Sequence, residues 1–222
     1  MKTTYTIELH CHTIFSKDSL TRPEKLVAVC REKGIDRVVI TDHNTTAGAL
    51  ACQALDPERV IIGEEIQTSQ GEILAAFIRE EIPPHLTPEE TIRRLRDQGA
   101  FISVSHPFDI YRNGHWELAD LQAITPLVDA IEVFNARCMQ AQHNQAAQAY
   151  AQTHGLLGTA GSDAHAAFEI GRASMVVPAF QDADSFKAGL ASAQIIGKLS
   201  SPFVHLTSRY AVWYKKLFSD VQ

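Results

Sequence analysis

Residues 6–12 read Thr-Ile-Glu-Leu-His-Cys-His, and this stretch decides how the chain folds. It continues a run with β-branched members, which is typical of a buried strand. Residues i and i+2 of a strand face the same side, so His10 and His12 can reach one ion. By the same alternation Cys11 points away from them into the core. The stretch therefore predicts a strand that ends in a pair of metal ligands.

The same arrangement recurs along the chain. His43 follows the apolar run 38–40, His106 follows 101–104, and Asp163 and His165 lie two residues apart after Gly161, which allows a close backbone approach. Asp18 lies where it can close back over the site. Glu64 and Glu65 end another strand; alternation turns one inward, and we choose Glu65, with Glu64 as the alternative. Imidazoles and carboxylates at several strand ends predict a metal-dependent hydrolase.

Apolar runs alternate with helical patterns through most of the chain. Strands are expected at 7–9, 36–40, 60–62, 73–78, 101–105, 130–134 and 174–177, and helices at 25–33, 46–55, 87–99, 140–153 and 182–191. A hairpin is expected through 69–71, and 106–114 is expected to be irregular. This alternation predicts one α/β domain over 1–222, with a parallel sheet or barrel and a helical tail over 200–222 that packs on it. In barrels the site lies at the carboxyl ends of the strands, where these histidines fall.

Composition and net charge limit the classes of binding partner that this chain can have. The chain has 222 residues, 45% of them hydrophobic, and a net charge of −6, so no basic field indicates a long nucleic acid or a membrane. Its four cysteines form no CxxC pair, and no apolar run reaches the length of a membrane span. We expect a cytoplasmic protein with free thiols. Homo-oligomerisation is left open.

Five motifs in order carry a resemblance to a known family: His10-Cys11-His12, Thr41-Asp42-His43-Asn44, Gly63-Glu64-Glu65, Ser105-His106-Pro107 and Gly161-Ser162-Asp163-Ala164-His165. Together they span residues 8–171, and the chain resembles the PHP (polymerase and histidinol phosphatase) family. The resemblance implies a distorted seven-stranded (β/α)7 barrel with two to three divalent ions, and the mixed imidazole and carboxylate ligands admit Zn, Mn or Fe. It assigns one ion to His10, His12, Glu65 and Asp163, a second to Asp18, His43 and His165, and part of a third to Glu65 and His106.

One stretch departs from the family pattern. Many members carry a histidine after the glutamate strand that completes the third metal site, but this chain has Leu74 there and no histidine in 71–77. There are three alternatives: Glu72 substitutes for the histidine, a water molecule fills the gap, or the third site is weak or empty. Our hypothesis is that two ions bind firmly and the third loosely.

For function, we expect a phosphoesterase in which a metal-bridging hydroxide attacks a small phosphomonoester, a nucleotide or a short oligonucleotide. Glu65, His106 and Asp163 are the expected catalytic residues. Asn135, Arg137 and Arg172 are the expected substrate-binding residues, Arg137 foremost as a phosphate clamp. Asp42 and Glu132 are expected to orient ligands, and Phe108 and Tyr111 to pack in the core rather than stack on a ring. The alternatives are an amide or lactone hydrolase and a non-catalytic metal-binding regulator.

Overall fold

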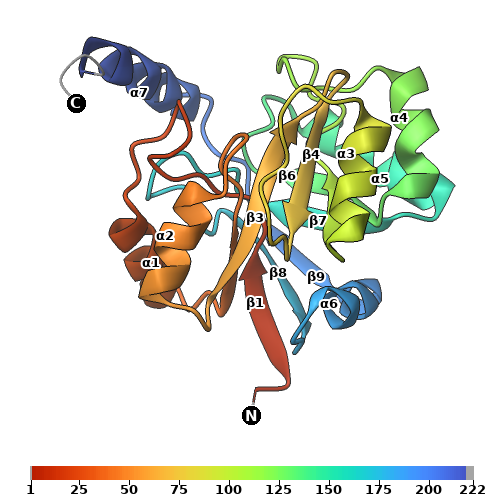
Figure 1. The fold of residues 1–222 in the computed structure, drawn as a ribbon, viewed down its shortest axis with the longest axis horizontal. Helices are drawn as coiled ribbons and strands as arrows, with labels where there is room; N and C mark the ends of the chain where they lie inside the picture. The colour runs from red at the N-terminus through yellow and green to blue at the C-terminus, as the bar shows by residue number, and fades with distance from the viewer. Residues whose placement is uncertain (1, 219–222) are drawn as a thin grey trace.

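The computed structural model describes residues 2–218, which form a curved sheet with helices on its outer side (Figure 1). Within that range the sheet has nine strands in the order β7-β6-β5-β4-β3-β2-β1-β8-β9. The strands are β1 (Thr4–Glu8), β2 (Arg37–Ile40), β3 (Val60–Gln67), β4 (Glu72–Ala76), β5 (Phe101–Val104), β6 (Ala130–Asn135), β7 (Leu157–Gly161), β8 (Ala173–Pro178) and β9 (Gln194–Gly197). The helices are α1 (Pro23–Glu32), α2 (Ala47–Leu55), α3 (Pro88–Asp97), α4 (Leu118–Ile124), α5 (Ala141–His154), α6 (Ala183–Gly189) and α7 (Val204–Phe218).

The sheet mixes parallel and antiparallel pairings and nearly closes into a barrel. β1, β2 and β3 pair in parallel, and so do β5, β6 and β7. β4 runs antiparallel between β3 and β5, as the hairpin through 69–71 requires, and β8 is antiparallel to β1. β7 approaches β8 from the other end of the sheet. The predicted α/β barrel is therefore confirmed.

Three elements differ from the expectation. The sheet has nine strands where seven were expected. β7 was missed because its five residues include two glycines and only one β-branched residue. β9 was missed because it is a short, exposed edge strand that pairs only with β8. α4 was missed as well, because its seven residues give too little apolar periodicity to be recognised. The core elements agree closely with the sequence. For example, α3 starts where the Thr87 hydroxyl accepts a hydrogen bond from Glu90 N.

The parallel strands place the carboxyl ends of β1, β2, β6 and β7 at one end of the barrel, on the side where α7 lies (Figure 1). Apolar side chains fill the space beneath that end. The four cysteines are buried and unpaired, and Cys11 points into the core, where its thiol donates to Val39 O (3.4 Å), as predicted. The barrel thus offers a rigid floor for side chains that emerge at its mouth.

α7 is fastened to that mouth from two sides. Arg137 Nη2 donates to Val204 O (3.0 Å) and to Ser208 Oγ (2.9 Å) near the start of the helix. Farther along, Lys215 Nζ donates to the carbonyls of Ile14 and Ser16. In the part of the chain that is described, no helix has the length and apolar character needed to cross a membrane.

Candidate metal centre

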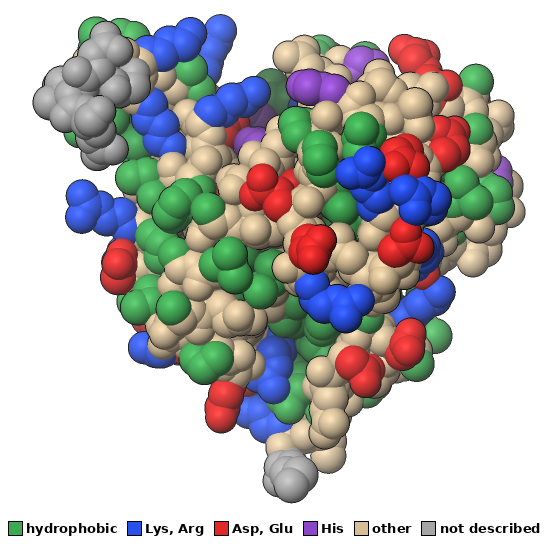
Figure 2. Space-filling view, in the orientation of Figure 1, with side chains coloured by type: hydrophobic (Ala, Val, Ile, Leu, Met, Phe, Trp, Pro, Cys, Tyr) green, Lys and Arg blue, Asp and Glu red, His purple; other side chains and the backbone are tan. Residues whose placement is uncertain are grey.

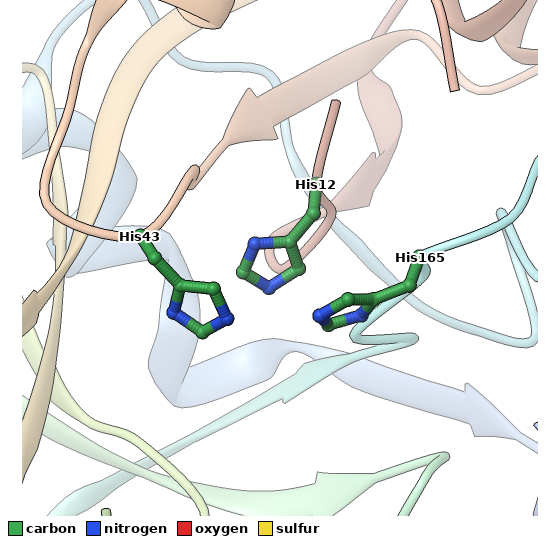
Figure 3. Close-up of side chains that lie close together, drawn as sticks. All are labelled: His12, His43 and His165. Carbon is green, nitrogen blue, oxygen red and sulfur yellow. The ribbon is translucent and has the colours of Figure 1, made fainter. Parts of the chain in front are cut away.

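Eight side chains converge at the barrel mouth although they come from five separate stretches of the chain. The rings of His12, His43 and His165 point toward one another (Figure 3), with centroids 4.4 Å apart for His12 and His43 and 4.1 Å apart for His12 and His165. All of the expected metal ligands lie in this cluster: His10, His12, Asp18, His43, Glu65, His106, Asp163 and His165.

Their donor atoms fall into overlapping groups, each compact enough for one ion. His10, His12 and Asp163 form one group, and His12, His43 and His165 form another. His12 Nε2 lies 3.3 Å from Asp163 Oδ1 and 3.4 Å from Glu65 Oε2. His12 thus stands between the two ion positions that the resemblance separates.

The carboxylates link these groups. Asp18 reaches His165 Nε2 (3.2 Å) and His43 Nε2 (3.6 Å), as its predicted closure over the site requires. Glu65 lies at the centre, with Oε2 3.0 Å from His43 Nδ1 and Oε1 3.1 Å from His106 Nε2. Glu64 faces the other side of β3, where it accepts a hydrogen bond from Ile82 N (3.0 Å). Of the adjacent pair, Glu65 is the one that points inward.

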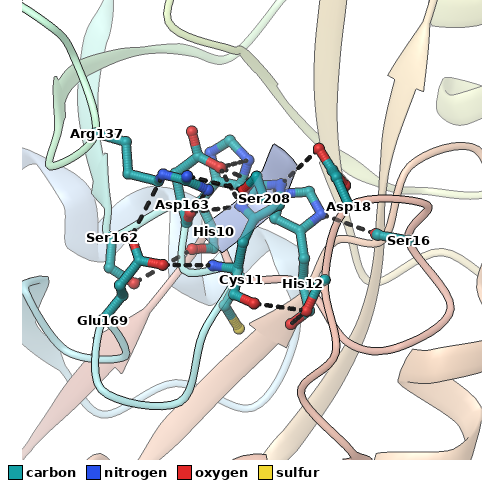
Figure 4. Close-up of polar contacts among 12 residues, drawn as sticks. His10, Cys11, His12, Ser16, Asp18, Arg137, Ser162, Asp163, Glu169 and Ser208 are labelled. Carbon is teal, nitrogen blue, oxygen red and sulfur yellow. Dashed lines mark hydrogen bonds and ion pairs between the residues drawn. The ribbon is translucent and has the colours of Figure 1, made fainter. Parts of the chain in front are cut away.

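Hydrogen bonds from behind fix how the imidazoles are turned (Figure 4). His12 Nδ1 donates to Ser16 Oγ (3.0 Å), and Ser16 in turn donates to Asp42 Oδ1 (2.6 Å). His10 Nδ1 donates to Glu132 Oε1 (3.0 Å). With Nδ1 protonated in each ring, the Nε2 lone pair is directed into the cluster, which is the tautomer that a metal requires.

The backbone around Asp163 is shaped for this role. Asp163 has φ 52°, a left-handed conformation that costs a non-glycine residue free energy and clusters at functional sites. A Cβ at Gly161 would collide with the Cβ of His10, so only glycine lets these two strands approach so closely. Asn135 Nδ2 donates to both Asp163 Oδ2 (3.1 Å) and Glu132 Oε2 (2.9 Å). Asp163 is thus held in one orientation.

The cluster also perturbs the charge states of its members. Burial raises the pKa of Glu65, but the imidazoles of His10 and His43 outweigh it and hold that pKa well below its usual value. Burial likewise raises the pKa of Asp163, and the opposing charges of Arg112 and His10 lower it well below the usual range. Both carboxylates are therefore ionised at neutral pH, which is the form that can bind a cation.

The donor set fits divalent cations. Two ligands about 2.1 Å from one ion at tetrahedral angles lie about 3.4 Å apart, which is close to the His–carboxylate separations of 3.3–3.6 Å seen here. His10 Nε2, His12 Nε2, Glu65 Oε2 and Asp163 Oδ1 are buried and have no hydrogen-bond partner among residues 2–218. Buried polar atoms are rarely left so. Mixed imidazole and carboxylate ligands suit Zn, Mn or Fe.

The expected substrate-binding residues lie at the edges of this cluster. Asn135 is fully buried behind Asp163 and does not face the mouth. The Arg137 guanidinium is engaged by Glu169 Oε2 (3.3 Å) as well as by α7. Arg172 Nη2 donates to Leu199 O (2.8 Å), and Arg172 is not among the residues that line the cleft described next.

A cleft of about 520 Å³ opens over the cluster, between α7 and the stretch after β5. Figure 2 shows it as a hollow in which histidine and acidic side chains are visible beside basic ones. Its walls include Asp18, His43, Glu72, Tyr111 and Arg112. Phe108 packs on Tyr150 with centroids 5.6 Å apart, as predicted, but Tyr111 is 61% exposed, so its predicted place in the core is wrong.

Sequence reasoning missed the most prominent cleft residue, Arg112. Its Nη1 lies 2.6 Å from Asp163 Oδ2 and its Nε donates to Asp109 Oδ2 (3.2 Å), while Nη2 is buried without a partner in the described part of the chain. Asp109 is itself backed by His143 Nδ1 (3.1 Å). The only sequence signal was its position six residues after His106, in a stretch that has no regular pattern.

Comparison with known proteins identifies the class. Residues 8–74 match the model of the PHP domain, and residues 141–194 match that of a PHP-associated region. Two uncharacterized proteins of Methanocaldococcus jannaschii are similar to this chain. The first is 38% identical over a stretch that covers 58% of this chain and 81% of the relative. The second is 36% identical over a stretch that covers 75% of this chain and 68% of the relative. A two-domain protein from Bacteroides vulgatus, described as containing a predicted PHP-like metal-dependent phosphoesterase, has the same fold, with a TM-score of 0.70 and 19% identity over 94% of this chain and 70% of that one.

The chain belongs to the PHP family, whose members are generally metal-dependent hydrolases. The family match spans the first three ligand motifs and the start of β4, and the geometry described above extends the cluster to His106, Asp163 and His165.

Proposed function

We propose that this protein is a metal-dependent phosphoesterase that hydrolyses a small phosphomonoester, a nucleotide or a short oligonucleotide. The observation that carries the proposal is the position of the Arg112 guanidinium. The guanidinium stands beside the Asp163 carboxylate in the wall of an open cleft, and its Nη2 has no hydrogen-bond partner among residues 2–218. A half-buried guanidinium with an unused donor suits a phosphoryl oxygen, because arginine binds phosphate through paired N–H groups.

The roles divide as follows. His10, His12, Asp18, His43, Glu65, His106, Asp163 and His165 hold the cations. Those cations, once bound, supply a lowered pKa for a nucleophilic water and charge stabilisation at the phosphoryl oxygens. Arg112 orients the phosphoryl group, and Asp109 holds the guanidinium in place. Arg137 and Asn135 position Asp163 from behind.

The cleft supports a small substrate. About 520 Å³ is in the range of pockets that hold a metabolite or a nucleotide. The exposed Tyr111 ring at the wall can stack on a base or a sugar face. A net charge of −6 disfavours a long nucleic acid. The phosphate of a small ester is therefore the group that the site recognises best.

Hydrolysis of p-nitrophenyl phosphate with added Mn²⁺ tests this proposal. We expect turnover by the wild type and a loss of at least about a hundredfold in His12→Ala, because that ring serves two ion positions. His154→Ala, an exposed histidine on α5, is the matched control and should keep full activity. No turnover of several phosphoesters with Mn, Zn or Fe would contradict the proposal. Hydrolysis of an amide or lactone instead, or metal retention without turnover, would identify the alternatives.

A further inference from the structure

A third group of donor atoms lies on the outer side of the cluster and includes Glu72, which is not part of the five motifs named in the sequence analysis. His43, Glu65 and Glu72 bring one ligand atom each within 4.8 Å of one another. His106 Nε2 lies between the two carboxylates, 3.1 Å from Glu65 Oε1 and 3.4 Å from Glu72 Oε2. This group is separate from the one that contains His10 and Asp163.

Strand register explains why Glu72, and not Leu74, reaches the cluster. Leu74 pairs directly with Glu65 across the β3–β4 hairpin and is buried among the apolar side chains beneath the metal centre. Glu72 is two residues earlier on the same face of β4 and pairs with Gln67 near the mouth. β4 thus places the apolar side chain of Leu74 beneath the metal centre and the carboxylate of Glu72 in the cleft.

The surroundings of Glu72 hold that carboxylate in place. Its backbone N donates to Gly114 O (3.1 Å), and its carbonyl accepts from Ser105 N (3.2 Å) and Trp116 Nε1 (3.1 Å). The side chain passes so close to Gly114 that a Cβ there would collide with the carboxylate. Within residues 2–218 the carboxylate accepts no hydrogen bond, and its side chain is only 12% exposed. Two carboxylates held this close, in little contact with water, repel each other unless a cation lies between them.

We propose that Glu72 is a ligand of a third divalent cation, together with Glu65 and His106. This inference rests on the metal centre proposed above and adds the ligand that Leu74 cannot provide. Two carboxylates and one imidazole form a harder donor set than the histidine-rich groups beside it. The third site therefore favours Mn²⁺ over Zn²⁺ and exchanges its ion more readily than the other two.

Calorimetric titration of the metal-free protein with Mn²⁺ tests the inference without any substrate. We expect three equivalents for the wild type and two for Glu72→Gln, with the affinities of the two remaining sites changed less than about threefold. Gly114→Ala leaves every ligand in place but displaces the Glu72 carboxylate, so it should weaken the third site by about tenfold or more. Glu117→Gln, which removes an exposed carboxylate close to the same loop, is the matched control.

Thermal unfolding of the metal-free variants separates a lost ligand from a damaged fold. Glu72→Gln relieves a like-charge contact, so its metal-free form should melt at or above the wild-type temperature. Equal stoichiometry and affinities in wild type and Glu72→Gln would overturn the inference, as would only two equivalents in the wild type or loss of all Mn²⁺ binding in the variant. The proposed phosphoesterase activity is tested by its own hydrolysis assay, so the metal titration can contradict the third site without contradicting that activity.

Discussion

At the scale of single residues, the site depends on which atom of each side chain faces inward. Glu132 accepts from His10 Nδ1, from His106 N (3.0 Å) and from Asn135, so one buried carboxylate orients parts of three strand ends. Ser16 and Asp42 do the same for His12. Such partners behind the ligands set ring orientation and tautomer, and therefore affect metal affinity although they touch no ion.

Arg112→Lys is the substitution that tests phosphate recognition. Lysine keeps the positive charge beside Asp163 but lacks the paired N–H groups, so we expect kcat/KM for p-nitrophenyl phosphate to fall about ten- to a hundredfold with the metal content unchanged. Arg79→Lys, an exposed arginine remote from the cleft, should have no effect. Arg172→Lys separates the two candidate residues: a fall there with none at Arg112 would contradict the account.

The residues that could be predicted are those whose chemistry is tied to a local pattern. HxH after a strand, and Asp163 with His165 after a glycine, place two ligands on one side by alternation alone. The cluster accordingly brings together every expected metal ligand. Arg112, Asp109 and His143 could not be found in this way. They meet through an irregular loop and a helix, and no periodicity links them. Arg137 was expected at the mouth and does line the cleft, but its contacts with Glu169 and with α7 depend on tertiary packing and could not be predicted.

At the scale of elements, charged side chains away from the mouth hold the outer helices on the sheet. Asp129, just before β6, has a side chain that is 1% exposed. It accepts from Ile102 N (2.9 Å) on β5, from Arg96 Nη1 (2.6 Å) on α3 and from Lys187 Nζ on α6. One carboxylate therefore joins two helices to two strands.

The stability that Asp129 provides should depend on pH. Burial raises its pKa, but the hydrogen bonds from Arg96 and Lys187 lower it below the usual value. A lowered folded pKa means that the contribution is complete above the unfolded value of about 3.9 and is lost as the pH falls through the folded value. We expect Asp129→Asn to lower the free energy of unfolding by about 1–2 kcal/mol at pH 7, discounted because both cations are partly exposed.

Urea unfolding of wild type and Asp129→Asn at neutral and at strongly acidic pH measures this, with both proteins free of metal. The difference between them should shrink at the acidic pH. Asp97→Asn is the control, because the Asp97 side chain on α3 is 64% exposed. This substitution should change the free energy of unfolding by less than about 0.5 kcal/mol. A difference that is the same at both pH values would show that the charge of Asp129 is not what stabilises the fold.

At the scale of the whole molecule, strand alternation with helices was enough to predict an α/β barrel, because parallel strands need helical crossovers. The strand count was not predictable. β9 has four exposed residues, and its pairing with β8 follows from where the chain returns after α6. The barrel's function follows from the same geometry, since it gathers strand ends that lie far apart in the sequence over one buried floor.

We infer that the barrel mouth is a divalent metal centre. Anomalous diffraction from crystals grown with Mn²⁺ tests it most directly, because each manganese ion gives its own peak in the anomalous difference map. We expect one peak bounded by His10, His12 and Asp163, a second bounded by His12, His43 and His165, and a weaker third beside Glu72 and His106. A map without peaks inside this cluster, at Mn²⁺ concentrations that saturate the protein in solution, would contradict it.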